Sequence, residues 1–250
     1  METILEAKGV CKFFGGLKAV NQVDMQVAKG DIFGIIGPNG AGKTTTFRML
    51  CGLLPVTSGD LRVAGVDVVK SRTAARSNFG YVAQKFSLYG NLSVMENLEF
   101  FAGVYGLYSQ KKDDRIEAVI KEFRLNDVRD MIAGDLPGGY KQRLSMAAAL
   151  MHEPKILFLD EPTSGIDPLT RRNFWRQITS LSKRGTTIII TTHFMDESEY
   201  CDRIMIQDAG KLVVLGTPDE VRRIAGDENC TMDEAFISVI LEKREQEDNV

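Results

Sequence analysis

The sequence predicts an α/β fold built on a mostly parallel sheet. Apolar runs of strand length alternate with helical patterns, for example the run at 31–36 before a helix at 44–50, and the β-branched run at 186–192. Alternation of this kind favours parallel strands joined by helices that cover the sheet. The 250 residues are enough for one large domain, or for a domain with an inserted subdomain.

Composition and charge are those of an ordinary soluble globular chain. Hydrophobic residues make up 44% and charged residues 26%, and the net charge of -3 includes no basic excess, so we expect no nucleic-acid partner. The four cysteines lack metal-like spacing and are expected to be reduced thiols. The N-terminus is not expected to be a signal peptide, and no apolar run approaches the roughly 20 residues of a membrane-spanning helix.

The first third of the chain predicts mainly strands. Residues 3–30 form two extended segments around a turn at Gly15-Gly16, because their apolar residues mostly alternate. After the helix at 44–50, the pattern predicts a loop at 55–60, a strand at 61–69 with a turn near Gly65, a short helix at 72–77 and a strand at 79–83 that ends at Gln84.

Helical patterns dominate residues 86–151, notably 94–105 and 113–123, and indicate an insertion into the strand-rich core. Strands return at 155–159 and 186–192. Between them Asp167 caps a helix with Pro168 at its first position, and Gly185 ends it. We expect three parts: a core of residues 1–85 and 152–225, a helical subdomain at 86–151, and a C-terminal helix and tail at 226–250.

Two capping boxes mark helices near the C-terminus, Thr217 with Glu220 and Thr231 with Glu234. The last helix carries an apolar stripe of Phe236, Val239 and Ile240. Such a stripe either packs on its own domain or forms a partner surface, and both interpretations stay open.

A glycine-rich motif stands between the strand at 31–36 and the helix at 44–50. It reads Gly37-Pro38-Asn39-Gly40-Ala41-Gly42-Lys43-Thr44-Thr45 and fits the G-x-x-x-x-G-K-[ST] phosphate loop. Glycines let successive backbone N–H groups point at phosphate oxygens, and the helix adds its positive N-terminal end. Lys43 is expected to reach the β- and γ-phosphates and Thr44 to hold Mg²⁺. The alternative is a chance glycine-rich turn.

Polar side chains follow three other predicted strands. Asp160 and Glu161 end the strand at 155–159, where Asp160 is suited to Mg²⁺ and Glu161 to accepting a proton from an attacking water. His193 ends the strand at 186–192 and can donate to a γ-phosphate, and Gln84 can contact the metal or the water. Since the carboxyl ends of parallel strands line a ligand crevice, we expect these residues to meet there. A pair of solvated loop acids is the alternative for Asp160 and Glu161.

These motifs, in this order, resemble the ATP-binding subunit of ABC transporters over residues 3 to about 240. The resemblance implies a RecA-like P-loop NTPase core, an antiparallel β subdomain and an inserted α-helical subdomain. It implies adenine stacking on Phe14, with Phe13 as the alternative, a Q-loop at Gln84, a Walker B aspartate at Asp160 and a catalytic Glu161. It also places the D-loop at Ser164 to Asp167 and the switch histidine at His193.

One family motif departs from the usual pattern. The signature L-S-G-G-Q is matched by Leu136-Pro137-Gly138-Gly139-Tyr140. In the family this segment reaches across a head-to-tail dimer to the γ-phosphate of the other subunit's ATP. Pro137 supplies neither the hydroxyl nor an N–H. The loss of one charge-assisted donor costs on the order of 1.5–3 kcal/mol of γ-phosphate contact, unless water or Tyr140 compensates.

The resemblance implies an ATPase with ATP and Mg²⁺ as ligands, integral membrane permease subunits as partners, and a second ATPase domain in a homodimer or heterodimer. It places the chain at the cytoplasmic face of the cell membrane. The stretch of residues 136–193 is similar to ATPases of multidrug-type exporters, which favours an exporter. The candidate permease contacts are Tyr89, Leu92, Val94 and Leu98, or else these are core. The alternatives are a soluble ABC-type ATPase for assembly or repair and a low-turnover regulatory nucleotide-binding module.

Overall fold

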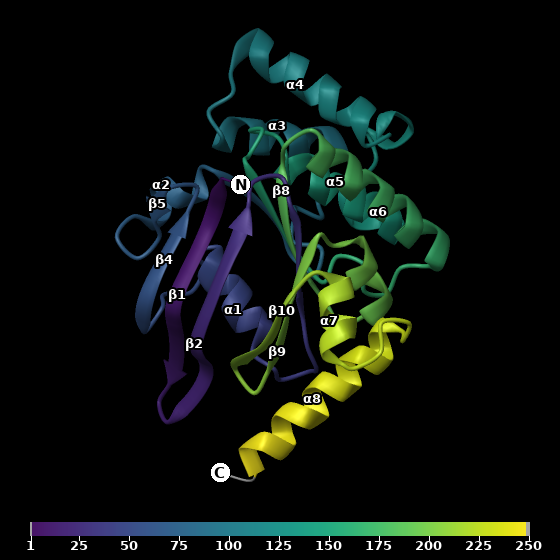
Figure 1. Cartoon of the computed structure of the whole chain (residues 1–250). Helices are drawn as coiled ribbons and strands as arrows, with labels where there is room; N and C mark the ends of the chain where they lie inside the picture. The colour runs from purple at the N-terminus through teal and green to yellow at the C-terminus, as the bar shows by residue number, and fades with distance from the viewer. Residues whose placement is uncertain (1, 249–250) are drawn as a thin grey trace.

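The computed structural model describes the backbone of residues 2–248 and the side chains of residues 2–246, and it confirms the α/β fold. Two sheets lie side by side in Figure 1. The antiparallel sheet has the order β2-β1-β4-β5 and the larger sheet the order β10-β9-β3-β8-β7-β6. The strands are β1 (Thr3–Phe14), β2 (Leu17–Ala28), β3 (Ile32–Ile36), β4 (Ser58–Val63), β5 (Val66–Asp67), β6 (Phe79–Val82), β7 (Ile156–Asp160), β8 (Thr187–Thr192), β9 (Arg203–Asp208) and β10 (Lys211–Gly216).

Within the larger sheet, β9, β3, β8, β7 and β6 run parallel, and β10 pairs antiparallel with β9 at one edge. The register pairs Ile36 of β3 with Thr192 of β8, and Thr191 of β8 with Asp160 of β7. The segments that leave the carboxyl ends of β3, β7 and β8 therefore begin at one edge of the sheet.

Both faces of the parallel sheet are buried, which explains the continuous apolar runs of its strands. In β7, Ile156 and Phe158 face one core cluster, and Leu157 and Leu159 face the other. Successive side chains of a strand point to opposite faces, so a fully buried strand shows no polar alternation. The first cluster lies between the two sheets and includes Phe47 of helix α1 (Lys43–Leu50) and Ala75 of helix α2 (Arg72–Arg76). The second lies under the helices that follow residue 93.

Within the described residues, the helices are α1 (Lys43–Leu50), α2 (Arg72–Arg76), α3 (Val94–Val104), α4 (Ser109–Glu122), α5 (Gly138–Ala149), α6 (Pro168–Lys183), α7 (Pro218–Ile224) and α8 (Met232–Asp248), with 3-10 turns at Asn126–Val128, Ala133–Asp135 and Met195–Tyr200. Figure 1 shows α3, α4 and α5 together at one end of the molecule and α8 at the opposite end. Ser93 with Glu96 forms a capping box at α3, and Asp167 caps α6 as predicted.

One local prediction is wrong. Residues 58–60 form the start of β4 rather than a loop, because their backbone pairs with β1, Asp60 opposite Lys8 and Ser58 opposite Cys11. The turn predicted near Gly65 is confirmed, and it separates β4 from the short β5 within the strand predicted at 61–69. Turn-forming residues enter a strand here because sheet pairing outweighs their weak local preference. The hairpin of β9 and β10 was not anticipated at all.

The C-terminal stripe packs on its own domain. Val239 and Ile240 are buried and Phe236 packs against the same core cluster, while Ile237 and Leu241 on the other side of α8 are exposed. The four cysteines are free thiols, as expected. Within residues 2–248, no helix has both the length and the apolar character to cross a bilayer.

Candidate functional site

The phosphate-loop motif forms the turn between β3 and α1. Its last glycine, Gly42, is the N-cap of α1 with φ of 96°, and the first turn of α1 contains no acidic residue. The free N–H groups of that turn and the positive end of the helix therefore face the loop unopposed, which suits an anion.

Two glycines of the loop are required by close approach of other backbone. A Cβ on Gly37 would lie 2.1 Å from the carbonyl oxygen of Gln207. A Cβ on Gly42 would lie 2.5 Å from the carbonyl oxygen of Ala19. Gln207 is itself fully buried. The loop conformation thus depends on β9, a strand that the sequence did not reveal.

An open cleft of about 490 Å³ lies over the loop. Its lining includes Phe14 from the end of β1 and Glu161 from the end of β7, together with residues 39–45. Phe14 is 49% exposed, and the ammonium of Lys12 lies 5.1 Å from the centre of its ring. Phe13 is not among the lining residues, so of the two candidate aromatics Phe14 faces the cleft. The sequence reasoning missed five further lining residues, Leu17, Lys18, Ala19, Ala209 and Gly210.

Lys43 is buried below the cleft. Its ammonium donates to the carbonyl oxygens of Gly37 at 2.8 Å and Pro38 at 3.1 Å. Burial lowers the pKa of Lys43, and the Glu161 and Asp160 carboxylates oppose that shift. A desolvated ammonium held by two neutral carbonyls gains strongly from a phosphate oxygen nearby, because hydrogen bonds between ionised groups are about twice as strong.

Asp160 ends β7 and is buried. Its Oδ1 accepts a hydrogen bond from the Thr191 hydroxyl at 2.8 Å. Burial raises the pKa of the Asp160 carboxyl, the Thr191 hydrogen bond opposes the rise, and the neighbouring Glu161 adds to it. The Thr191 hydrogen bond fixes the orientation of the carboxylate, and burial of its charge lowers the free energy of unfolding. Such an arrangement is typical of functional sites.

Glu161 is the meeting point of the strand ends. Its Oε2 accepts a hydrogen bond from Gln84 Nε2 at 2.9 Å and lies 3.2 Å from His193 Nδ1. Its own backbone N–H donates to Thr191 at both the carbonyl and the hydroxyl oxygen. With φ of 44°, Glu161 adopts a left-handed conformation that is unfavourable for a non-glycine residue. The structure thus brings together three residues predicted from separate strands.

The oxygen atoms that surround Glu161 are suitable ligands for Mg²⁺. Thr44 presents an exposed hydroxyl at the start of α1, Asp160 a carboxylate, and Gln84 an amide oxygen left free by its bond through Nε2. Hard oxygen ligands are those that Mg²⁺ prefers, with substrate phosphates and water completing its shell. Among the described residues, no cluster of three or more His, Cys, Asp or Glu could hold a metal without such help.

The signature-like segment lies outside the cleft. Pro137 is the N-cap of α5 and makes no side-chain capping bond, and both Pro137 and Gly138 are exposed. A Cβ on Gly138 would meet nothing within 4 Å. Leu136 is buried, Gly139 approaches Thr170, and Tyr140 packs against the core. None of these five residues lines the cleft over the phosphate loop.

The D-loop residues differ in their surroundings. Ser164 is exposed, whereas Asp167 accepts hydrogen bonds from the backbone N–H groups of Leu169 and Thr170, both at 3.0 Å. The hydrogen bonds to Thr170 hold the pKa of the Asp167 carboxyl below its usual value. The side chain of Asp167 is therefore engaged in capping α6.

A buried ion pair next to His193 escaped the sequence reasoning. Glu197 is fully buried, accepts a hydrogen bond from the Thr192 hydroxyl at 2.6 Å, and lies 3.6 Å from Nε of Arg171 on α6. The Arg171 guanidinium also lies 4.2 Å from the centre of the Phe194 ring. These contacts join the segment after His193 to the helix that follows the D-loop. Nothing in the sequence distinguishes Glu197 from its acidic neighbours Asp196 and Glu199, which are not buried.

The fold and the site define the chain as a P-loop nucleotide-binding cassette. Residues 20–164 match the model of the ABC transporter family, and the chain belongs to that family.

Relatives and solved structures agree with this assignment. The chain is 53% identical over 242 residues to the probable multidrug ABC transporter ATP-binding protein YbhF of Escherichia coli (strain K12). The matched residues make up 96% of this chain and 42% of YbhF. It is 40% identical over 222 residues to the Nod factor export ATP-binding protein I of Cupriavidus metallidurans, 88% of this chain and 73% of that protein. A solved structure of an ATP-binding subunit of an ABC transporter superposes with a TM-score of 0.86 at 28% identity, covering 95% of this chain and 99% of that one. The chain therefore spans less than half the length of YbhF.

Proposed function

We propose that this chain binds and hydrolyses ATP with Mg²⁺ and uses the reaction to drive the membrane subunits of an exporter. The observation that carries the proposal is the convergence of Gln84 and His193 on one oxygen of Glu161, which itself lines the cleft over the phosphate loop.

ATP binding follows from the loop and its surroundings. The N–H groups of residues 39–45 and the ammonium of Lys43 bind the phosphates, and Phe14 stacks on the adenine at the open end of the same cleft. Thr44, Asp160 and Gln84 would hold Mg²⁺, which would supply positive charge beside the phosphate oxygens.

Hydrolysis follows from Glu161. Its carboxylate accepts a proton from a water that attacks the γ-phosphorus, as the bond from that phosphorus to the bridging oxygen breaks and ADP leaves. Gln84 and His193 fix the carboxylate through hydrogen bonds. His193 is 38% exposed at its side chain, compared with 14% for Glu161, so the imidazole is open to contact with a ligand.

A second ATPase domain completes the site. Gly138 opens α5 on an exposed surface with free space around it, and the signature-like segment lies outside its own chain's cleft. A backbone so exposed suits close contact with a phosphate bound by another domain. That domain is either a second copy of this chain or a different ATPase domain. Ser164 and Asp167 are also exposed and are proposed to contact the same second domain.

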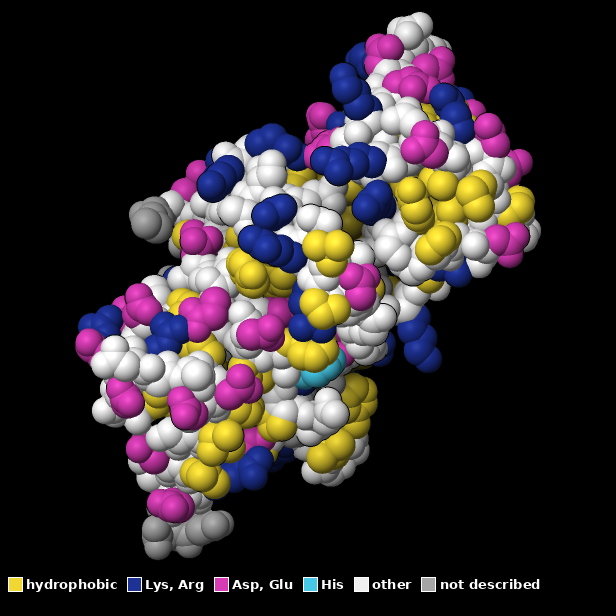
Figure 2. All heavy atoms as spheres, turned by 90° about the vertical axis from the view of Figure 1, so that its right-hand side faces the viewer, with side chains coloured by type: hydrophobic (Ala, Val, Ile, Leu, Met, Phe, Trp, Pro, Cys, Tyr) yellow, Lys and Arg dark blue, Asp and Glu magenta, His cyan; other side chains and the backbone are white. Residues whose placement is uncertain are grey.

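The permease surface is assigned to the helical part of the molecule. Figure 2 shows hydrophobic side chains gathered on the upper part of one face. Tyr89 is 46% exposed, but Val94 and Leu98 are fully buried core and cannot serve as contacts, and Leu92 is only partly exposed. Within residues 86–151, the exposed large hydrophobic residues are Tyr89, Phe100, Val104, Tyr108, Met131 and Ile132. Contact with permease subunits would hold the chain at the cytoplasmic face of the membrane.

The division into three parts agrees with these roles. Residues 1–85 and 152–225 bind ATP, residues 86–151 carry the permease contacts and the signature-like segment, and residues 226–250 contain the last helix and tail. Export rather than import is proposed because the relatives named above are a probable multidrug transporter component and a Nod factor export component.

The substitution Glu161→Gln tests the proposal. Loss of the proton acceptor is expected to lower ATP turnover by about 100-fold or more, while the affinity for Mg²⁺-ATP stays within a few fold. Phosphate release and equilibrium ATP binding measure the two effects. Glu99→Gln on the exposed face of α3 is the matched control and should leave both unchanged.

Two outcomes would change the conclusion. Equal turnover in the Glu161→Gln chain and the unaltered chain, with turnover well above background, would remove Glu161 from the mechanism. Tight ATP binding with negligible turnover in both would favour the low-turnover regulatory module, which Pro137 makes the second candidate.

A further inference from the structure

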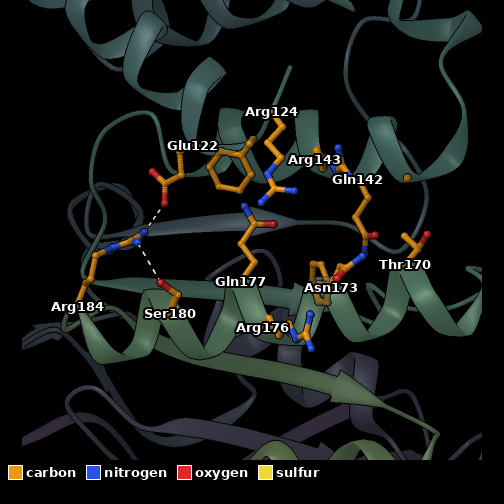
Figure 3. Close-up of a pocket in the computed structure, with 13 residues that line it drawn as sticks. Glu122, Arg124, Gln142, Arg143, Thr170, Asn173, Arg176, Gln177, Ser180 and Arg184 are labelled. Carbon is orange, nitrogen blue, oxygen red and sulfur yellow. Dashed lines mark hydrogen bonds and ion pairs between the residues drawn. The ribbon is translucent and has the colours of Figure 1, made fainter. Parts of the chain in front are cut away.

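A second cleft, of about 350 Å³, lies away from the phosphate loop between the end of α4, the first turns of α5 and one face of α6. Figure 3 shows its lining. Four arginines surround it, Arg124, Arg143, Arg176 and Arg184, and the only acidic residue among its lining residues is Glu122. A concentration of positive charge is unexpected on a chain whose net charge is -3.

Most of this positive charge is not neutralised. Glu122 pairs with Arg184, which also donates to the Ser180 hydroxyl at 3.2 Å. Arg143 lies over the ring of Tyr140, 5.1 Å from its centre, and remains half-buried. Within residues 2–246, no carboxylate lies within ion-pair distance of Arg124, Arg143 or Arg176.

The position of Arg124 argues that the charge is not incidental. Arg124 follows the end of α4 with φ of 51°, a left-handed conformation that favours glycine. Figure 3 shows its guanidinium extending toward Gln177, which reaches up from α6. An arginine placed where glycine would be less strained, and directed at a cavity, indicates a role for the guanidinium.

The rest of the lining suits a hydrogen-bonding ligand rather than an apolar one. Residues Thr170, Asn173, Gln177 and Ser180 recur every three or four positions and therefore present one polar face of α6 to the cleft. Phe123 and Phe174 are buried and also line it. A cavity of this size suits a small molecule.

We propose that this cleft binds a small molecule that carries two or more phosphate groups. Guanidinium groups bind phosphate oxygens in pairs, and the neutral polar side chains of α6 bind the remaining oxygens or hydroxyls. The ligand would contact Arg124, which follows α4, and Arg143 of α5 on one side of the cleft. On the other side it would contact Asn173 and Gln177 of α6. This site is separate from the phosphate loop, and none of its lining residues is shared with the cleft around Lys43. One lining residue, Gly139, belongs to the signature-like segment.

The test measures binding of inorganic pyrophosphate to the full chain by isothermal titration calorimetry at constant ionic strength. The background substitution Lys43→Ala removes the main phosphate contact of the ATP cleft, so that the remaining binding reports the second cleft. We expect one binding site per chain. In the same background Arg124→Gly should weaken the affinity about tenfold or more, because it removes a charge-assisted contact.

The controls keep folding and charge separate from binding. Arg124→Gly is compatible with the positive φ, so its thermal unfolding midpoint should not fall. Arg172→Ala removes an exposed arginine of α6 that does not line the cleft, and it should change the affinity by less than twofold.

Three results would overturn the proposal. They are the absence of pyrophosphate binding in the Lys43→Ala chain, equal weakening by Arg124→Gly and Arg172→Ala, and displacement of pyrophosphate by a tetraglutamate peptide at lower concentration. The last result would assign the cleft to an acidic peptide. Since ATP hydrolysis is not measured, these outcomes do not depend on the proposed ATPase function.

Discussion

At the residue scale, the site combines buried charge with strained backbone. Asp160 and Lys43 are both nearly inaccessible, and Glu161 adopts a left-handed conformation. Each of these features lowers the stability of the fold and is compatible with it only because the surrounding strands are fully buried. Side chains held this way need little reorganisation when phosphate and metal bind, which is the advantage of a preorganised site.

Asp160 allows a direct test of this exchange of stability for function. Its pKa is raised by burial. Below the ordinary value of 3.8 the carboxyl is protonated in both folded and unfolded chains and costs nothing, whereas above its folded-state pKa the buried charge lowers the free energy of unfolding. Asp160→Asn should therefore raise the free energy of unfolding at neutral pH by on the order of 1 kcal/mol and abolish Mg²⁺-dependent ATP hydrolysis.

Denaturant unfolding at neutral and acidic pH measures the first effect, which should vanish in acid. Asp60→Asn, at an exposed position of β4, is the matched control. A less stable Asp160→Asn chain at neutral pH would contradict the assignment of burial as the dominant influence.

At the scale of elements, helix ends carry much of the proposed chemistry. The N-terminus of α1 faces the phosphate loop, Asp167 caps α6, and α5 begins without a side-chain cap at Pro137. The amides of Tyr140 and Lys141 already donate to the Pro137 carbonyl, at 2.9 and 3.1 Å. The serine of the family signature would occupy the N-cap position, where its hydroxyl could cap the helix or bind a phosphate.

Pro137→Ser should raise ATP turnover about tenfold if the hydroxyl binds the γ-phosphate across the dimer. Stability should change little, because an N-cap contributes about 0.5–2 kcal/mol while the loss of proline costs about 0.4–1 kcal/mol. Phosphate release and denaturant unfolding measure the two quantities. Pro137→Ala removes the proline without adding a hydroxyl and should give no gain in turnover. A gain in both variants would mean that backbone flexibility, not the hydroxyl, limits the reaction.

At the scale of the whole molecule, the two halves of the proposed reaction centre lie on different surfaces. The cleft with Lys43 and the exposed Gly138 segment do not share a lining residue, so a second domain is needed to unite them. If two copies of this chain form that dimer, each site takes its phosphate loop from one copy and its Gly138 segment from the other.

Mixing two inactive variants tests this arrangement. Lys43→Ala removes the loop contact, and Gly138→Asp places a negative charge toward the phosphate in open space, without a clash and at the favourable first turn of α5. Each variant alone should be inactive, whereas an equal mixture should recover about a quarter of the unaltered rate, because half of the dimers contain one intact site of two. No recovery at any ratio would argue for one-chain sites or for an obligatory different partner.

Local chemistry explains how much the sequence could predict. The phosphate loop, the buried strands before Gly37 and Asp160, and the caps of α6 and α7 are specified by residues close together in the chain, through backbone conformation, burial and hydrogen bonding. The roles assigned to Phe14, Gln84, Glu161 and His193 remain predictions. The sequence alone nevertheless showed that Gln84, Glu161 and His193 each follow a strand.

What only the tertiary structure decided involves residues distant in the chain. The pairing of β9 with β3, the pairing of Ser58 with β1, and the contact of Gly37 with Gln207 depend on segments up to 170 residues apart. The same holds for Glu197 with Arg171 and for the arginines around the second cleft. Polar side chains on separate helices show no period or motif in the sequence, and their chemistry appears only when packing brings them to a common cavity.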